Sequence, residues 1–285
     1  MKIGVASHTA IDNIVNNDLE RISIGGPTYY AGLMIKELNL KPVLITKVGY
    51  DFPFEMDKYN MIERSYAVAS PTTRFKLVIQ GYKRRLFLLA RCEDLSSNDI
   101  IDLDGYVISP ITNEISNEMV RDIIKHSNFI FLDPQGFVRR FKDKECYIAR
   151  TDLLTDNIDV IKVDEEEAYA LTGLYGLDAV RSLKSKIIIL TTKDSTRMVY
   201  NDKLYIIRFN PIDSIDSTGI GDIFAATYTC SYMKDKDPVW ALSLAVASSI
   251  ASLKKNNFGI DKIPDSRTVE KEGERIFKSI EVKAF

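Results

Sequence analysis

Short apolar runs typical of buried β-strands alternate along the chain with longer segments of helical periodicity. The strand candidates are KIGVAS (2–7), KPVLITKVG (41–49), YVISP (106–110), NFIFLDP (128–134), DVIKV (159–163) and KIIILTT (186–192). The helical candidates are TYYAGLMIKELN (28–39), SNEMVRDIIKHS (116–127), DEEEAYALTG (164–173) and DAVRSLKS (178–185). Apolar strands separated by helices indicate a parallel sheet covered on both faces. The alternation therefore predicts a layered α/β fold.

One segment, residues 72–90, departs from this alternation. The alternating apolar residues in its first half are Phe75, Leu77 and Ile79. A turn at residues 81–83 and a second β-run follow, so the segment is expected to form a β-hairpin. Residues 12–24 are expected to add strands beside it. Because a small sheet cannot bury both its faces alone, we expect it to cover a cleft in the core or to pair with another subunit.

Charge and cysteine content exclude several classes of protein. The chain has 38 Lys and Arg against 40 Asp and Glu, which gives no electrostatic reason to bind nucleic acid or an acidic membrane. The cysteines are Cys92, Cys146 and Cys230. They form no CxxC pair and indicate neither a disulfide framework nor a zinc site. The sequence has no membrane-length apolar run and no signal-peptide core at its start, so we expect a cytoplasmic protein.

Several polar or glycine-rich segments adjoin the predicted strands and helices. They are Asp12, IGGPTYY (24–30), DEEE (164–167), TTKDST (191–196) and DSTGIGD (216–222). Most have an ordinary structural explanation when taken singly, since acidic residues suit any helix start and Gly-Gly pairs are common in turns. In DSTGIGD, however, two glycines surround Ile220 immediately before an apolar helical run, which is more than a helix cap requires. This segment is the strongest single candidate for a functional loop.

The order of these segments resembles the ribokinase-like (PfkB-type) family of carbohydrate and nucleoside kinases over nearly the whole chain. GGPTYYAGLMIKELNLKPVLITKVGYD (25–51) is similar to the first signature region of that family, and IDSTGIGDIFAA (215–226) is similar to the second. DEEEAYALTG resembles its Asn-x-x-Glu segment. The resemblance implies one domain over residues 1–285, a three-layer sandwich around a mostly parallel sheet. It also implies a small β-sheet lid built from about residues 12–24 and 70–92.

The resemblance implies transfer of a phosphoryl group from MgATP to a hydroxyl of a sugar or polyol. Backbone amides of Gly219, Ile220 and Gly221 at a helix start would form an anion hole. Asp222 would accept the proton of the attacking hydroxyl. The segments LLARCEDL (88–95) and DPQGFVRRF (133–141) look like those of archaeal relatives that include inositol kinases.

The same resemblance assigns further residues to ligands. The acceptor residues are Asp12, Gly25, Gly26, Tyr30, Gln135 and Arg139. The nucleotide residues are Asp164, Thr191, Lys193, Ala245, Ser249, Asn257 and Gly259. Asp164 and Glu167 would organise Mg²⁺ through water, and the loop that carries Asp216 would bind a monovalent cation such as K⁺.

The sequence departs from the family pattern at a few positions. Ile220 replaces the usual Ala, where only the amide is needed, and Asp164 stands where Asn is usual. Lys193 and Thr196 replace two glycines, which leaves the geometry of that loop open. Tyr30 replaces a common substrate-binding Asn, so we expect an acceptor that is not held as ribose is.

Other functions remain as alternatives. In a nucleoside kinase of the same family, Tyr29, Tyr30 or Phe137 could stack on a base. A dinucleotide-dependent oxidoreductase would need GxGxxG after the first strand, where the chain reads GVASHTAID (4–12). A non-catalytic homologue that binds ligand would lack the base, whereas Asp222 is present. The sequence leaves open the acceptor, the choice of ATP or ADP as donor, and whether the lid forms a homodimer.

Overall fold

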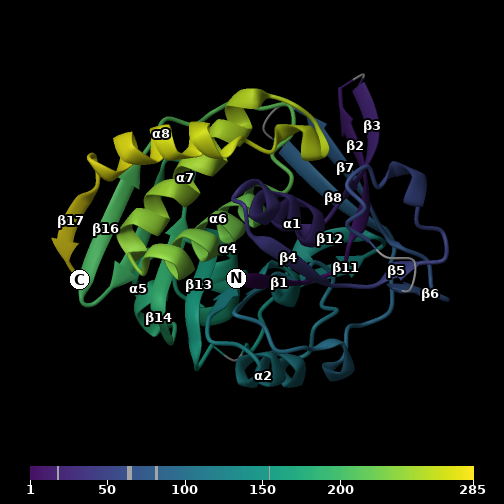
Figure 1. Cartoon of the computed structure of the whole chain (residues 1–285), viewed down its shortest axis with the longest axis horizontal. Helices are drawn as coiled ribbons and strands as arrows, with labels where there is room; N and C mark the ends of the chain where they lie inside the picture. The colour runs from purple at the N-terminus through teal and green to yellow at the C-terminus, as the bar shows by residue number, and fades with distance from the viewer. Residues whose placement is uncertain (18, 63–65, 81–82, 154) are drawn as a thin grey trace.

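The computed structural model describes residues 1–17, 19–62, 66–80, 83–153 and 155–285. Its larger sheet has the strand order β17-β16-β15-β14-β13-β10-β9-β1-β4 (Figure 1). The parallel strands are β1 (Lys2–Ala6), β4 (Lys41–Ile45), β9 (Gly105–Ile108), β10 (Ile130–Leu132), β13 (Ile158–Asp164) and β14 (Ser185–Thr191). The antiparallel strands at one edge are β15 (Ser195–Tyr200), β16 (Lys203–Arg208) and β17 (Glu281–Ala284).

Helices cover both faces of this sheet (Figure 1). One face packs against α1 (Pro27–Glu37), α6 (Ile220–Asp235), α7 (Pro238–Lys255) and α8 (Ser266–Phe277). The other packs against α2 (Asn117–Lys125), α4 (Glu165–Thr172) and α5 (Gly176–Ser182). Both faces of the sheet are apolar, because successive side chains of a strand point to opposite faces. In β14, Ile187 and Ile189 pack in the layer with α1, α6, α7 and α8, and Ile188 and Leu190 pack in the layer with α2, α4 and α5. The predicted α/β class and the mostly parallel sheet are confirmed.

A smaller sheet lies beside the core in the order β11-β12-β8-β7-β2-β3. Its strands are β2 (Ala10–Asn16), β3 (Leu19–Gly25), β7 (Thr73–Gln80), β8 (Lys83–Ala90), β11 (Arg139–Lys142) and β12 (Glu145–Ile148). We call this six-stranded sheet the lid sheet. A turn was expected at residues 81–83, of which 81 and 82 lie outside the described residues and Lys83 is the first residue of β8. The β7–β8 hairpin and the strands beside it match the prediction, whereas β11 and β12 had not been expected.

The remaining elements are short. Strands β5 (Val48–Gly49) and β6 (Ala67–Val68) form a separate pair, and α3 (Gln135–Val138) precedes β11. The 3₁₀ turns are η1 (Phe54–Met56), η3 (Ser97–Asp99) and η4 (Gly259–Lys262). Among the described residues, no helix combines the length and the apolar character needed to cross a membrane.

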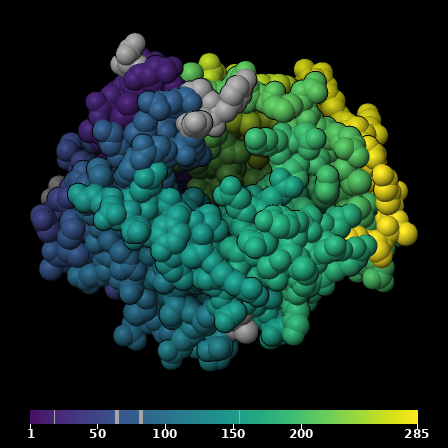
Figure 2. Space-filling view, turned by 180° about the vertical axis from the view of Figure 1, so that it is seen from behind, coloured from purple at the N-terminus to yellow at the C-terminus, as the bar shows by residue number. Residues whose placement is uncertain are grey.

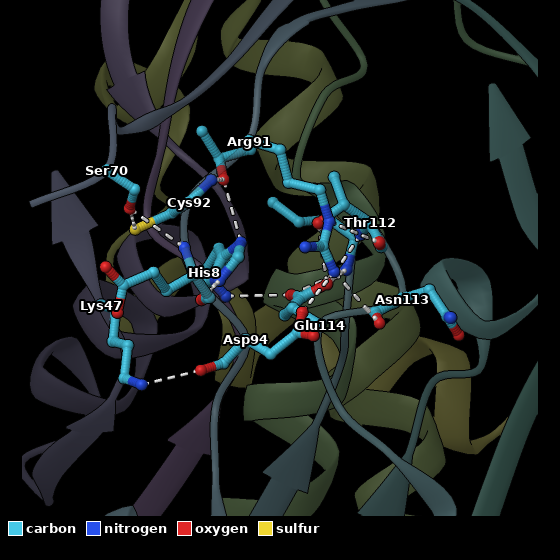
Figure 3. A network of polar contacts seen from close by, with 12 residues as sticks. His8, Lys47, Ser70, Arg91, Cys92, Asp94, Thr112, Asn113 and Glu114 are labelled. Carbon is cyan, nitrogen blue, oxygen red and sulfur yellow. Dashed lines mark hydrogen bonds and ion pairs between the residues drawn. The ribbon is translucent and has the colours of Figure 1, made fainter. Parts of the chain in front are cut away.

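A buried polar network joins the lid sheet to the loop after β1 (Figure 3). The Glu114 carboxylate accepts hydrogen bonds from the hydroxyl of Ser7 and from the amides of His8, Ile111 and Thr112. The His8 ring in turn contacts the Thr73 hydroxyl of β7 at 2.9 Å. Burial would raise the pKa of Glu114, but His8 and the backbone amides lower it below its ordinary value. The ionised carboxylate therefore fixes the base of the lid sheet to the core.

Candidate active site

Two cavities meet at the amino end of α6, between the carboxyl ends of the parallel strands and the lid sheet. We call the smaller one, of about 240 Å³, the acceptor cavity, and the larger one, of about 810 Å³, the donor cavity. The residues that line both are Lys162, Asp164, Ser217 and Gly221. Figure 2 shows a hollow in this face, between purple and blue residues on one side and green residues on the other. Ligands of open parallel sheets bind at this edge.

Helix α6 begins at a glycine that no other residue could replace easily. Gly219 is the N-cap with φ of 77°, and a Cβ there would lie 2.3 Å from the ring of Tyr30. No side chain in the described part of the chain caps this helix start. Asp222, in the first turn, instead accepts hydrogen bonds from Ser109 Oγ at 3.1 Å and Gln135 Nε2 at 3.5 Å. The carboxylate therefore faces the acceptor cavity and does not serve as the cap.

The surroundings of Asp222 make its carboxyl a weaker acid than an ordinary aspartate. The side chain is 5% exposed, and burial raises its pKa to about 7. Burial is the largest cause of this rise, the neighbouring Asp133 carboxylate adds to it, and Ser109 and Lys162 oppose it. A carboxylate that is protonated and deprotonated near neutral pH is suited to general-base catalysis.

Lys162 is a site residue that the sequence analysis missed. It lies on β13, and its ammonium donates to Asp133 Oδ2 at 2.8 Å. A Cβ added at Gly221 would lie 3.5 Å from this ammonium, so the positive charge sits beside the start of α6. Burial would lower the pKa of Lys162, but Asp133 and Glu167 raise it above its ordinary value. The signal in the sequence was a lysine inside the otherwise apolar run VIKV (160–163).

Asp164 and Glu167 form a reciprocal cap at the start of α4. The amide of Glu167 donates to Asp164 Oδ1 at 2.8 Å, and the amide of Asp164 donates to Glu167 Oε2 at 2.9 Å. Burial and the nearby Asp133 raise the pKa of Glu167 to about 8. No group of three or more His, Cys, Asp or Glu among the described residues could hold a metal by itself. The acidic pair fits Mg²⁺ that keeps water and takes phosphate oxygens as its other ligands.

The acceptor cavity contains two buried oxygen atoms without a partner in the described part of the chain. They are Asp12 Oδ2 and the hydroxyl of Tyr30. A Cβ at Gly25 would lie 2.0 Å from Asp12 Oδ2, so the bare glycine leaves the space that the carboxylate occupies. Burial raises the pKa of Asp12 to about 7, and Asp216 adds to the shift, against Arg84, Lys262 and Arg139. Unpaired buried polar atoms of this kind suit the hydroxyls of a ligand.

The lid sheet closes one side of the acceptor cavity. The lid residues that line it are Ala10, Asp12, Phe75, Arg84, Leu86 and Arg139. The guanidinium of Arg84 also donates to the hydroxyls of Ser217 at 3.3 Å and Thr218 at 3.1 Å, in the loop before α6. Most of the acceptor residues expected from the sequence line this cavity, namely Asp12, Gly26, Tyr30, Gln135 and Arg139. Gly25 lies behind Asp12.

The donor cavity gathers only some of the expected nucleotide residues. Asp164, Thr191, Lys193 and Ser249 line it. Ala245 is fully buried and does not line the cavity, whereas Val246, Ser249, Ile250 and Leu253 of the same helix do. Asn257 donates to Asp261 O, and the amide of Gly259 donates to Asp216 Oδ2. An apolar wall that the sequence analysis missed contains Phe209, Pro211, Ile212 and Phe224.

Asp216 has a partner that the sequence analysis did not expect. The ammonium of Lys262 lies 2.6 Å from Asp216 Oδ2, and both side chains are buried. Burial would raise the pKa of Asp216, but Lys262 lowers it, so the carboxylate stays ionised. The expectation that this loop binds a monovalent cation does not fit, because a lysine already occupies the carboxylate.

Two of the three aromatic residues considered for stacking on a base lie elsewhere. The hydroxyl of Tyr29 donates to the buried carboxylate of Asp57. Phe137 belongs to the hydrophobic layer around α2, α4 and α5. Tyr30 lines the acceptor cavity, with its ring against Gly219.

Solved structures share this fold. One is a pyrophosphate-dependent kinase in the ribokinase family, 21% identical, with 95% of this chain and 99% of that chain covered and a TM-score of 0.79. Arabidopsis thaliana ribokinase with ribose and ATP is 16% identical, with 96% and 98% covered and a TM-score of 0.73. Methanocaldococcus jannaschii nucleoside kinase is 20% identical, with 96% and 98% covered and a TM-score of 0.71. The fold is therefore that of the ribokinases.

The sequence identifies the family within that fold. Residues 66–265 match the model of the pfkB family of carbohydrate kinases, and the chain belongs to this family. Its members are kinases that phosphorylate hydroxyl groups of sugars and polyols. No curated protein sequence matched the chain. The kinase class expected from the signature segments is confirmed.

Proposed function

We propose that the chain transfers the γ-phosphoryl group of MgATP to a hydroxyl of a sugar or polyol. The observation that carries this proposal is the meeting of the donor and acceptor cavities at the start of α6, with Asp222 buried at the junction. The acceptor oxygen forms a bond to the γ-phosphorus while the bond to the β,γ-bridging oxygen breaks. ADP leaves with that electron pair, and Asp222 takes the hydroxyl proton.

The helix start supplies the stabilisation that such a transfer needs. The amides of Gly219, Ile220 and Gly221 lie at the helix start, where N–H groups have no acceptor within the helix. They can therefore donate to the oxygens of the moving phosphoryl group. The ammonium of Lys162 adds a fixed positive charge beside them. Asp164 and Glu167 would hold Mg²⁺ through water, and the bound cation would neutralise charge on the donor phosphates.

The cavities favour particular ligands. The apolar wall of the donor cavity suits a nucleotide base, which pyrophosphate lacks. The acceptor cavity is smaller than those that take drug-sized ligands and is ringed by charged groups. Tyr29 and Phe137 do not line it, and the ring of Tyr30 packs against Gly219, so a small polyol fits better than a nucleoside.

A panel of reactions tests this proposal. Sugars, cyclitols and nucleosides would each be incubated with Mg²⁺ and ATP, ADP or pyrophosphate, and acceptor-dependent phosphorylated product would be measured by mass spectrometry. We expect the highest kcat/KM for ATP with a sugar or a cyclitol. A nucleoside as best acceptor, or pyrophosphate as best donor, would contradict the corresponding part of the proposal.

Substitution of Asp12 should weaken acceptor binding selectively. At pH 8, above the raised pKa of Asp12, Asp12→Ala removes a charged hydrogen-bond acceptor, and such bonds contribute about 1.5–3 kcal/mol. We expect the acceptor KM to rise about ten-fold or more, with little change in MgATP affinity. Asn13→Ala is the matched control, because the next residue of β2 bonds to Glu20 at the surface. Equal losses for both substrates would indicate a role in folding instead.

The pH profile of kcat/KM should have an acidic limb, in which the rate falls as the pH drops below about 7. Asp222 acts as a base only when ionised, and burial raises its pKa to about 7. We expect kcat/KM to fall about ten-fold for each pH unit below that value and to level off above it. The limb should persist in Asp12→Asn, although the pKa of Asp12 is also raised to about 7. A limb that disappears in Asp12→Asn would assign the titration to Asp12.

A further inference from the structure

The loop before α6 surrounds a buried ammonium group. The Nζ atom of Lys262 donates to Asp216 Oδ2 at 2.6 Å, to Asp216 O at 2.9 Å and to Thr218 O at 2.8 Å. The side chains of Lys262 and Asp216 are 1% and 0% exposed. The ring of Tyr30 lies beside the ammonium, with its centroid 5.6 Å away. One carboxylate and two carbonyl oxygens therefore satisfy all three N–H donors of the lysine.

These oxygen ligands differ from those of an ordinary ion pair. Carbonyl and carboxylate oxygens converging on one point are the ligands that a desolvated monovalent cation takes. The second half of the Asp216 carboxylate holds the same loop, because its Oδ1 accepts from the amide of Thr218 at 2.8 Å. Thr218 immediately precedes Gly219, the N-cap of α6. The position of the ammonium therefore determines the path of the chain into the anion-binding helix start.

We propose that Lys262 is a tethered monovalent cation that fixes the loop at residues 216–219, so that the chain needs no K⁺ there. Its ammonium occupies the point on which the oxygen atoms converge, and a K⁺ ion would have to displace it. The lysine comes from η4, after α7, and covalent attachment keeps it in place at any salt concentration. The catalytic consequence rests on the proposed kinase function, whereas the structural consequence does not.

Two measurements on the wild-type protein test this assignment first. Melting temperature and phosphoryl transfer would be compared in about 100 mM KCl and in tetramethylammonium chloride at the same ionic strength. We expect transfer rates within about two-fold and equal melting temperatures, because the Lys262 ammonium already fills the site at this loop. A ten-fold or larger activation by K⁺, or a K⁺-specific rise in melting temperature, overturns the proposal.

The Lys262→Met variant should regain a response to small cations. Removing the ammonium leaves the Asp216 carboxylate buried and unpaired, so we expect the melting temperature to fall by about 5–10 °C. K⁺ or NH₄⁺ should restore part of this loss and part of the lost activity, whereas tetramethylammonium is too large to enter. Lys254→Met removes an exposed lysine of α7 and is the matched control, expected to show neither effect.

The outcomes distinguish a failure of the Lys262 assignment from a failure of the proposed kinase function. A folded Lys262→Met protein that responds equally to K⁺ and tetramethylammonium overturns the cation assignment. If that variant does not fold, the wild-type comparison decides, since it needs no substitution. If no acceptor is phosphorylated at all, the proposed function fails, and the melting temperatures still test Lys262.

Discussion

Asp222→Asn is expected to lower kcat by about 10²–10⁴-fold while leaving the protein folded. Asparagine keeps the size of the side chain and can still accept the hydrogen bond from Ser109 Oγ. It cannot take the proton of the attacking hydroxyl. The pKa of the wild-type carboxyl is about 7 in the folded protein against an ordinary value of 3.8, so its ionisation costs stability as pH rises through that window. The variant should therefore be at least as stable as wild type at pH 8.

Steady-state turnover, thermal melting and binding of a non-hydrolysable ATP analogue would be measured on the same preparations. Analogue affinity should hardly change, because the helix amides remain in place. Ser109→Ala is the matched control, since it removes a hydrogen bond to Asp222 but leaves the carboxylate, and we expect a loss of about ten-fold or less. A folded Asp222→Asn protein that turns over at nearly the wild-type rate would show that Asp222 is not the base.

Lys162→Met should reduce both turnover and stability. The ammonium lies beside Gly221 at the junction of the two cavities, where it would stabilise charge that develops on the moving phosphoryl group. Loss of one such group typically costs about 10²–10³-fold in kcat. It also leaves Asp133 buried without its cation, and breaking a buried pair costs about 3–5 kcal/mol of the free energy of unfolding.

A second substitution separates these two effects. Lys162→Met combined with Asp133→Asn removes both charges, so stability should largely return while kcat stays low. Lys186→Met is the matched control, because Lys186 pairs with Asp159 at 2.5 Å but its side chain is 73% exposed. Recovery of kcat together with stability in the double variant would show that Lys162 acts only through the packing of β13.

The layered core was predictable because its strands carry apolar residues on both faces, as residues 187–190 of β14 do. The three antiparallel strands at the sheet edge, β15, β16 and β17, were not among the strands expected from the sequence. Strands β11 and β12 were also missed. Each has only four residues, and β11 is mostly charged, so neither shows a clear strand pattern. They join β8 through a pairing between Glu145 and Phe87, which lie far apart in the sequence.

The parts of the site that could be predicted lie in continuous segments. The segment 216–222 contains the helix start, its glycines and Asp222 together, and the family resemblance supplied their roles. The ion pairs could not be predicted, because Lys162 is 29 residues from Asp133 and Lys262 is 46 residues from Asp216. Only the folded sheet and the packing of η4 under the loop bring these charges together.

The most direct test of the proposed reaction is to follow the fate of the γ-phosphoryl group by ³¹P nuclear magnetic resonance. Wild-type protein would be incubated with MgATP, with and without the best acceptor from the panel. We expect the γ-phosphate signal to be replaced by a phosphomonoester signal only when the acceptor is present, with ADP formed in equal amount. Release of inorganic phosphate at the same rate without acceptor, or no phosphomonoester with any acceptor, would contradict direct transfer between the two cavities.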